Sequence, residues 1–186
     1  MSSTLIQRSV LQAQVNVMDE VRLQVYCTHL ASDLSNSIQY NGTEFDSFAA
    51  EQKAQINEFL THITDQKHEN PVAILGDLNT GPANDINQAE LPENFELFQA
   101  QGYRSPYIQA DSLCTHCSDN TIIDGDGSGG DMIDHVLFKG IDIEQLIAKR
   151  TFDQTQAVTI DDMSQKLHLS DHFGIQVAVP LAFLAR

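Results

Sequence analysis

The chain has 186 residues, of which 41% are hydrophobic and 19% charged, a composition typical of one folded domain and not of a disordered chain. Acidic residues outnumber basic ones by 26 to 10, and the net charge of −16 argues against tight binding of nucleic-acid phosphates through a basic surface. The sequence shows neither a signal peptide nor an apolar run of the roughly 18 residues that a membrane span needs, and the cellular compartment stays undecided.

The first predicted elements are two strands in a hairpin, followed by a helix. Apolar and polar residues alternate over 10–17 and again over 21–27, which is the period-two pattern of half-buried strands. The polar stretch 31–43 predicts a loop. Apolar residues then recur at spacings of three and four, which predicts an amphipathic helix over 45–66 with Thr43 as its cap.

The rest of the chain alternates short strands with loops and one more helix. A continuous apolar run over 72–75 predicts a strand buried on both faces, and a second helix is expected over 88–101. The stretch 103–131 is rich in loop-forming residues. Further strands are predicted over 132–138, 141–150 and 173–179. Strands with interspersed helices indicate a layered α/β domain with its site among loops at strand ends.

Four polar clusters fall where predicted strands end. Each places an ionisable side chain beside an apolar run: Thr28-His29-Leu30, Gly76-Asp77-Leu78-Asn79, Asp134-His135 and Leu169-Ser170-Asp171-His172-Phe173. Each cluster alone is ordinary, because a carboxylate after a strand is usually a turn residue or a helix cap. Together they supply carboxylates for a hard divalent cation and histidines for proton transfer near neutral pH, as phosphodiester hydrolysis requires.

Three of these clusters resemble motifs of the endonuclease/exonuclease/phosphatase superfamily, which includes DNase I, abasic-site endonucleases, inositol polyphosphate 5-phosphatases and neutral sphingomyelinases. The matching segments, in order, are Gly76-Asp77-Leu78-Asn79-Thr80, Ile133-Asp134-His135-Val136-Leu137-Phe138 and Leu169-Ser170-Asp171-His172-Phe173. The strand that ends before His29 is similar to the DNase I and sphingomyelinase branches. The resemblance covers about residues 9–180 and implies the DNase I-like fold, a four-layer α/β sandwich of two packed mixed sheets flanked by helices.

The resemblance implies a metal-dependent phosphoester hydrolase and gives each matched residue a role. His172 would activate the attacking water, and Asp134 would be its paired carboxylate. Asp77 and Asn79 would orient the water and hold the phosphate. His29 would hydrogen-bond a phosphate oxygen or assist the leaving group. The histidine that follows Asp134 should face away from the pocket, because neighbouring residues of a strand point to opposite faces.

The metal-binding part of the resemblance is incomplete. Asp171 and Asp77 would bind Mg²⁺ or Mn²⁺, but the strand-ending glutamate that is the family's principal metal ligand has no counterpart before residue 29, since Glu20 falls in a hairpin turn. We therefore expect residues 1–186 to form a single partial domain that lacks the N-terminal strands of the fold. Strand edges exposed in such a domain could pair in a homodimer.

Two further patterns are compatible with metal binding. Asp124, Asp126 and Ser128 match the opening of an EF-hand Ca²⁺ loop, although the closing glutamate and the flanking helices are missing and a flexible glycine-rich connection is the simpler interpretation. Cys114 and Cys117 are expected to be ordinary loop cysteines, with a local disulfide or half of a zinc site as alternatives.

The sequence leaves the substrate open. Without a cluster of basic residues, we expect a small phosphoester, a lipid headgroup or a weakly bound nucleic acid, and the choice should depend on the loops 31–43 and 103–131. The alternative function is a catalytically inactive or truncated relative that acts as a binding or self-associating module. An unrelated acidic domain with incidental motifs would leave Asp77, Asp134 and His172 far apart.

Overall fold

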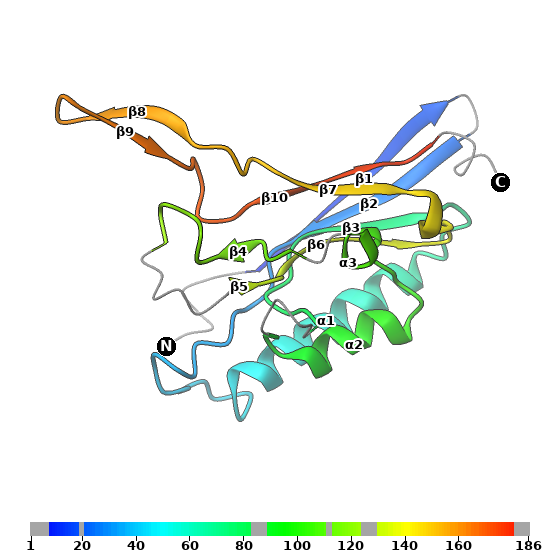
Figure 1. Ribbon diagram of the computed structural model, residues 1–186. Helices are drawn as coiled ribbons and strands as arrows, with labels where there is room; N and C mark the ends of the chain where they lie inside the picture. Colours follow the sequence, from blue (N-terminus) through cyan, green and yellow to red (C-terminus); the bar gives the residue numbers. More distant parts are fainter. Residues whose placement is uncertain (1–7, 19–20, 83–88, 111–112, 124–129, 181–186) are drawn as a thin grey trace.

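A four-stranded sheet is the centre of the molecule (Figure 1). The computed structural model describes residues 8–18, 21–82, 89–110, 113–123 and 130–180. The sheet contains β1 (Val10–Met18), β2 (Val21–Thr28), β3 (Val72–Asp77) and β6 (Asp134–Lys139), in that order. β2 and β3 are parallel, while β1 and β6 run antiparallel to their neighbours. The predicted hairpin of the first two strands is therefore confirmed.

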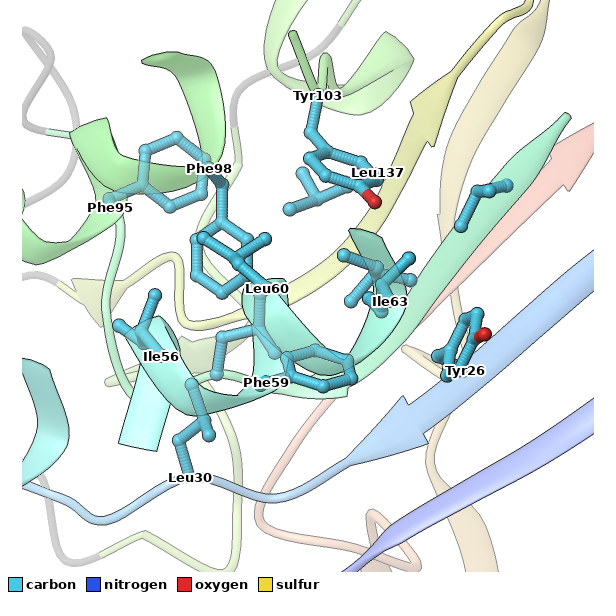
Figure 2. Packing of buried hydrophobic residues seen from close by; sticks show 13 residues of the cluster. Tyr26, Leu30, Ile56, Phe59, Leu60, Ile63, Phe95, Phe98, Tyr103 and Leu137 are labelled. Atoms are coloured by element: carbon cyan, nitrogen blue, oxygen red, sulfur yellow. The ribbon is translucent and has the colours of Figure 1, made fainter. Parts of the chain in front are cut away.

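Two helices cover one face of this sheet. α1 (Phe48–Asp65) and α2 (Pro92–Ala100) lie side by side beneath it in Figure 1. Figure 2 shows the core between the helices and the sheet, where aromatic and aliphatic side chains of both layers interdigitate. Tyr26 of β2 and Ile74 of β3 are fully buried there. Burial of this apolar surface is the main stabilising contribution on this side of the sheet.

A second, smaller sheet packs against the opposite face. β7 (Ile147–Thr151) and β10 (Gly174–Ala178) are antiparallel, and Val177 packs with Ala73 and Phe138 of the larger sheet. The described chain therefore has three layers: helices, a four-stranded sheet and a two-stranded sheet. Ile147 on the outer face of the small sheet is exposed. Two packed sheets with flanking helices are thus present, and a fourth layer stays a prediction.

The remaining elements are short. They are α3 (Pro106–Ala110), β4 (His116–Cys117), β5 (Gly130–Asp131), the 3₁₀ helix η1 (Ile143–Gln145), β8 (Gln156–Ile160) and β9 (Met163–Leu167). β8 and β9 form a hairpin that projects away from the sheets (Figure 1). In its turn, Asp161 and Asp162 both have positive φ, as a two-residue hairpin turn of type I′ requires. Among the described helices, none is long and apolar enough to span a bilayer.

Three sequence predictions need correction. α1 begins at Phe48 and not at residue 45, because Ser47 is the cap that accepts the N–H of Ala50, so Thr43 is not the cap. The strand predicted over 141–150 is divided: η1 occupies its first part, where the Asp142 carboxylate accepts the N–H of Glu144, and only the second part is extended. The β8–β9 hairpin was not predicted, because nearly all of its residues are exposed and give no burial pattern.

Candidate active site

One edge of the four-stranded sheet brings the predicted polar residues together. The parallel strands β2 and β3 both end at this edge, whereas β6 begins there because it runs antiparallel to β3. The strand register places Asp77 directly opposite Asp134. The backbone N–H of Leu30 donates to the Asp77 carbonyl at 3.0 Å, which fixes the segment after β2, including His29, to the same edge.

A glycine allows the two parallel strands to approach closely at this edge. Gly76 has φ +134°, and a Cβ at this position would lie 2.0 Å from the carbonyl oxygen of Thr28. Any other residue would push β2 away from β3 and separate His29 from Asp77. The close approach of the two strands therefore explains why the first residue of the Gly-Asp-Leu-Asn motif is glycine.

His172 and Asp134 form the predicted pair. His172 directly precedes Phe173 and β10, and its Nδ1 lies 2.8 Å from Oδ2 of Asp134. Both side chains are partly exposed. The hydrogen bond to Asp134 raises the pKa of His172 above its usual value, although partial burial opposes the shift. Asp134 therefore orients the imidazole and stabilises its protonated form.

A second acid–histidine pair lies beside the first. Nε2 of His29 is 3.3 Å from Oδ2 of Asp77, and the His29 side chain is 58% exposed. Burial raises the pKa of Asp77, and the nearby Asp134 carboxylate raises it further, whereas the N–H of Asn79 and the charge of His29 act in the opposite direction. The site thus contains two facing carboxylates, each with a histidine partner.

The facing carboxylates fit a divalent cation. Oxygens of Asp77 and Asp134 and a ring nitrogen of His172 all lie within 4.8 Å of one another. Like charges directly opposite each other on neighbouring strands repel, and a hard cation would relieve this repulsion through the oxygen ligands it prefers. This convergence of three distant segments contradicts the alternative of an unrelated domain with incidental motifs.

Asn79 is buried and Asp171 is exposed. Asn79 is 5% exposed, and its side-chain amide donates to the Leu30 carbonyl at 2.9 Å. Its backbone N–H donates to the Asp77 carboxylate at 2.9 Å, so Asn79 holds both the carboxylate and the loop after β2. Asp171 accepts a long hydrogen bond from the Ser170 hydroxyl and lies outside the three-residue group. The phosphate-binding role of Asn79 and the metal-binding role of Asp171 stay predictions.

His135 points away from this site, as strand alternation predicts. Its ring is 2% exposed on the helix side of the sheet, 4.7 Å from the ring of Phe95. Its Nε2–H donates to the Thr80 carbonyl at 2.8 Å. Burial lowers the pKa of His135 to about 4, so the ring is neutral at physiological pH. The proposed Ca²⁺-binding residues Asp124, Asp126 and Ser128, like Glu20, lie outside the described residues.

Sequence reasoning missed a residue that connects the two segments that carry Asp134 and His172. Thr115 Oγ1 accepts the N–H of Asp134 at 3.1 Å, and the Thr115 carbonyl accepts the N–H of Phe173 at 2.8 Å. Thr115 therefore links the start of β6 to the segment that carries His172. A threonine in a polar loop gives no sequence signal for such a role.

Two cysteines flank Thr115 and are joined in a disulfide. The bond between Cys114 and Cys117 corrects the expectation of ordinary loop cysteines, and it leaves no thiolate pair for zinc. His116 lies between the two cysteines and forms an antiparallel β-bridge with His172. The centres of the two imidazole rings lie 5.0 Å apart. The Cys-x-x-Cys spacing was a usable signal for the disulfide, but it did not indicate proximity to the candidate active site.

Glu90 is a further acidic side chain that the sequence did not single out. Its carboxylate accepts the N–H of Asp33 at 2.9 Å and the hydroxyl of Ser32 at 3.3 Å. Burial raises the pKa of Glu90, and the charges of Asp131 and Asp77 add to this effect. Glu90 therefore secures the loop after β2 and adds to the negative charge near the site.

Solved structures share this fold. The beta toxin of Staphylococcus aureus has a TM-score of 0.66 and 14% identity, over 93% of this chain and 57% of its own. Truncated TDP2 of Caenorhabditis elegans has a TM-score of 0.60 and 15% sequence identity, and the match covers 95% of this chain and 61% of TDP2. An endonuclease/exonuclease/phosphatase of Beutenbergia cavernae DSM 12333 has a TM-score of 0.59 and 18% sequence identity, and the match covers 91% of this chain and 38% of that protein.

The fold is shared with solved endonuclease/exonuclease/phosphatase proteins, which confirms the fold that the sequence motifs predicted. This chain spans less than two thirds of the length of each of the three structures. No protein-family model matches the sequence, and no curated protein matches it either.

Proposed function

We propose that the protein is a divalent-metal-dependent phosphoester hydrolase in which His172 activates a water molecule. The observation that carries this proposal is the 2.8 Å hydrogen bond between His172 and Asp134, formed beside the facing carboxylate of Asp77. An imidazole held by a carboxylate next to clustered acidic oxygens is the arrangement that water activation at phosphorus requires.

The proton-transfer role of His172 follows from its hydrogen bond. Because Asp134 accepts the Nδ1–H, the neutral ring has its lone pair on Nε2, which can take a proton from water. The same carboxylate then stabilises the protonated ring. His29 is exposed beside Asp77 and would donate a hydrogen bond to a phosphate oxygen or to the leaving group.

The acidic side chains would hold the cation. Asp77, with its carboxylate oriented by the N–H of Asn79, is the candidate ligand, and Asp171 is a second one from the neighbouring segment. A bound Mg²⁺ or Mn²⁺ would stabilise the negative charge of the reacting phosphate. A variant of the Staphylococcus aureus beta toxin with the same fold has bound magnesium ions, which supports this choice.

The negative charge of the protein limits which substrates can bind. The net charge of −16 disfavours long polyanions, so a small phosphoester, a lipid headgroup or a weakly bound nucleic acid fits best. A second candidate function is a non-catalytic, self-associating module. The exposed Leu11 and Val15 on the edge strand β1 favour it, because such apolar edges pair readily with other strands and a homodimer could form there.

The test is hydrolysis of bis-p-nitrophenyl phosphate in the presence of Mn²⁺, with and without EDTA. The parent protein should release p-nitrophenolate in a metal-dependent reaction, and His172→Ala should lose most of the rate. His62→Ala on the exposed side of α1 is the matched control and should behave as the parent. Equal rates for the parent and His172→Ala would reject the proposed function.

A further inference from the structure

An open cleft adjoins the catalytic pair. It has a volume of about 690 Å³, and Asp134 and His172 form part of its wall. The rest of the lining consists mainly of Phe152, Leu169, Phe173 and two glutamines, and none of the described residues that line it is Lys or Arg. A group that enters this cleft is therefore next to the Asp134–His172 pair. The guanidinium of Arg150 lies 4.4 Å from the centre of the Phe173 ring, but it is already paired with the carboxylates of Asp119 and Asp153.

Two large apolar side chains of the cleft are unusually exposed. Phe152 is 78% exposed and Leu169 is 73% exposed, although both lie within reach of a partly buried site. Scattered exposed apolar residues need no explanation, but two that flank a catalytic histidine indicate a surface that a ligand covers. The ring of Phe152 lies against Gly174, where a Cβ would be 2.9 Å from its Cδ2.

The backbone of Phe152 is strained. Its φ is +59°, in the left-handed region that bulky residues avoid and glycine adopts freely. The exposed ring gains little from packing in return, so burial in the folded protein does not account for the conformation. Strained residues of this kind persist mainly at functional sites.

We propose that Phe152 is the platform of a substrate subsite, on which a flat ring attached to the scissile phosphate stacks. This inference rests on the proposed function and specifies its substrate class: a phosphoester with an uncharged aromatic or heteroaromatic group. Aromatic rings stack on exposed aromatic side chains in this way regardless of sequence or exact structure.

The glutamines of the cleft favour a ring with polar edges over an aliphatic chain. Gln154 and Gln156 line the cleft and are exposed, so their amides can donate to and accept from the edge of a heterocycle such as a pyrimidine base. An acyl chain would bury these amides without partners, at a cost in affinity. The occupant is therefore a ring of the nucleobase kind, carried on a small phosphoester.

The experiment compares binding of thymidine 5′-monophosphate, hexyl phosphate and methyl phosphate by calorimetry with Mn²⁺ present. The parent should bind thymidine 5′-monophosphate roughly tenfold more tightly than methyl phosphate, Phe152→Ala should lose this preference, and Phe152→Tyr should retain it. Ile147→Ala, which removes an apolar side chain that is 71% exposed and outside the cleft, should bind as the parent does.

The backbone provides an independent readout. Phe152→Gly should raise Tm by about 2–4 °C, because glycine adopts a positive φ without strain, while it abolishes the preference for the ring. A preference that survives in Phe152→Ala, or tighter binding of hexyl phosphate than of thymidine 5′-monophosphate, would overturn the proposed subsite. Because binding is measured directly, these results are separate from the hydrolysis test: a protein that binds rings at Phe152 but hydrolyses nothing would refute only the proposed function.

Discussion

Two histidines that lie on opposite faces of the β3–β6 pair have pKa values shifted in opposite directions. On the helix face, His135 is buried beside Phe95 and donates to the neutral Thr80 carbonyl, and its pKa is lowered to about 4. On the other face, His172 bonds to the carboxylate of Asp134, and its pKa is raised. The partner decides the charge: burial without a counterion favours the neutral ring, whereas a carboxylate stabilises the protonated ring.

Strand alternation separates the two regions. Asp134 and His135 are neighbours in sequence, yet one side chain faces the small sheet and the other faces the helices. Changes on the helix face should therefore alter stability, and changes on the opposite face should alter activity. The following variants test this division, from the largest expected effect to the smallest.

The largest effect is expected for Asp134→Asn. The amide cannot stabilise protonated His172 or hold it in the productive orientation, so kcat/KM for bis-p-nitrophenyl phosphate should fall by roughly 10³-fold. Asp65→Asn, the same change at an exposed position near the end of α1, should leave the rate unchanged. A rate for Asp134→Asn within threefold of the parent would show that the pair has no part in catalysis.

Ile74→Ala addresses the helix face of the same sheet. Ile74 is fully buried in the core against α1 and α2, and its truncation should cost about 3.5 kcal/mol of unfolding free energy through lost burial and a cavity. Urea denaturation measures this loss. At temperatures where the variant is folded, kcat should equal that of the parent, and a coupled loss of kcat would show that the two faces are not independent.

The neutral state of His135 predicts a dependence of stability on pH. The unfolded chain binds a proton near pH 6.5, while the folded chain binds it only near pH 4, so acid favours unfolding over this interval. Between pH 7 and pH 4 the parent should lose roughly 3 kcal/mol relative to His135→Asn, which cannot titrate. Denaturation curves at both pH values for both proteins measure the difference. Parallel losses in the two proteins would contradict a buried neutral ring.

The smallest effect is the titration of His172 itself, followed by NMR in the metal-free protein. The pKa should lie above the usual 6.5, and Asp134→Asn should lower it. The sign for stability is opposite to that of His135: the contribution of His172 is complete below pH 6.5 and is lost as the pH rises through the raised pKa. An unchanged pKa in Asp134→Asn would mean that the 2.8 Å hydrogen bond does not persist in solution.

The elements and contacts that could be predicted from the sequence are those with a regular burial pattern or a recognisable motif. Alternation located β1 and β2, and the apolar run before Gly76 located β3, because these patterns follow directly from which face is buried. The pairing of Asp134 with His172 was also predicted, since the family that the motifs resemble places these two side chains next to each other. The exposed β8–β9 hairpin has no such pattern and could not be found.

Other parts of the site depend on tertiary contacts that no local pattern records. Thr115 connects Asp134 to Phe173 through its hydroxyl and carbonyl, and nothing in its loop indicates this. The strained φ of Phe152 is likewise invisible in sequence, because a phenylalanine is not expected in the left-handed region. Such features emerge only when distant segments are packed together.

The most direct measurement places the two histidines side by side: Tm and Mn²⁺-dependent hydrolysis for His172→Asn and His135→Asn. We predict that His172→Asn keeps the Tm of the parent and loses the hydrolysis, whereas His135→Asn lowers the Tm and, when folded, keeps kcat. If His172→Asn hydrolyses the substrate as fast as His135→Asn does, the assignment of the catalytic site to the Asp134–His172 edge of the sheet is wrong.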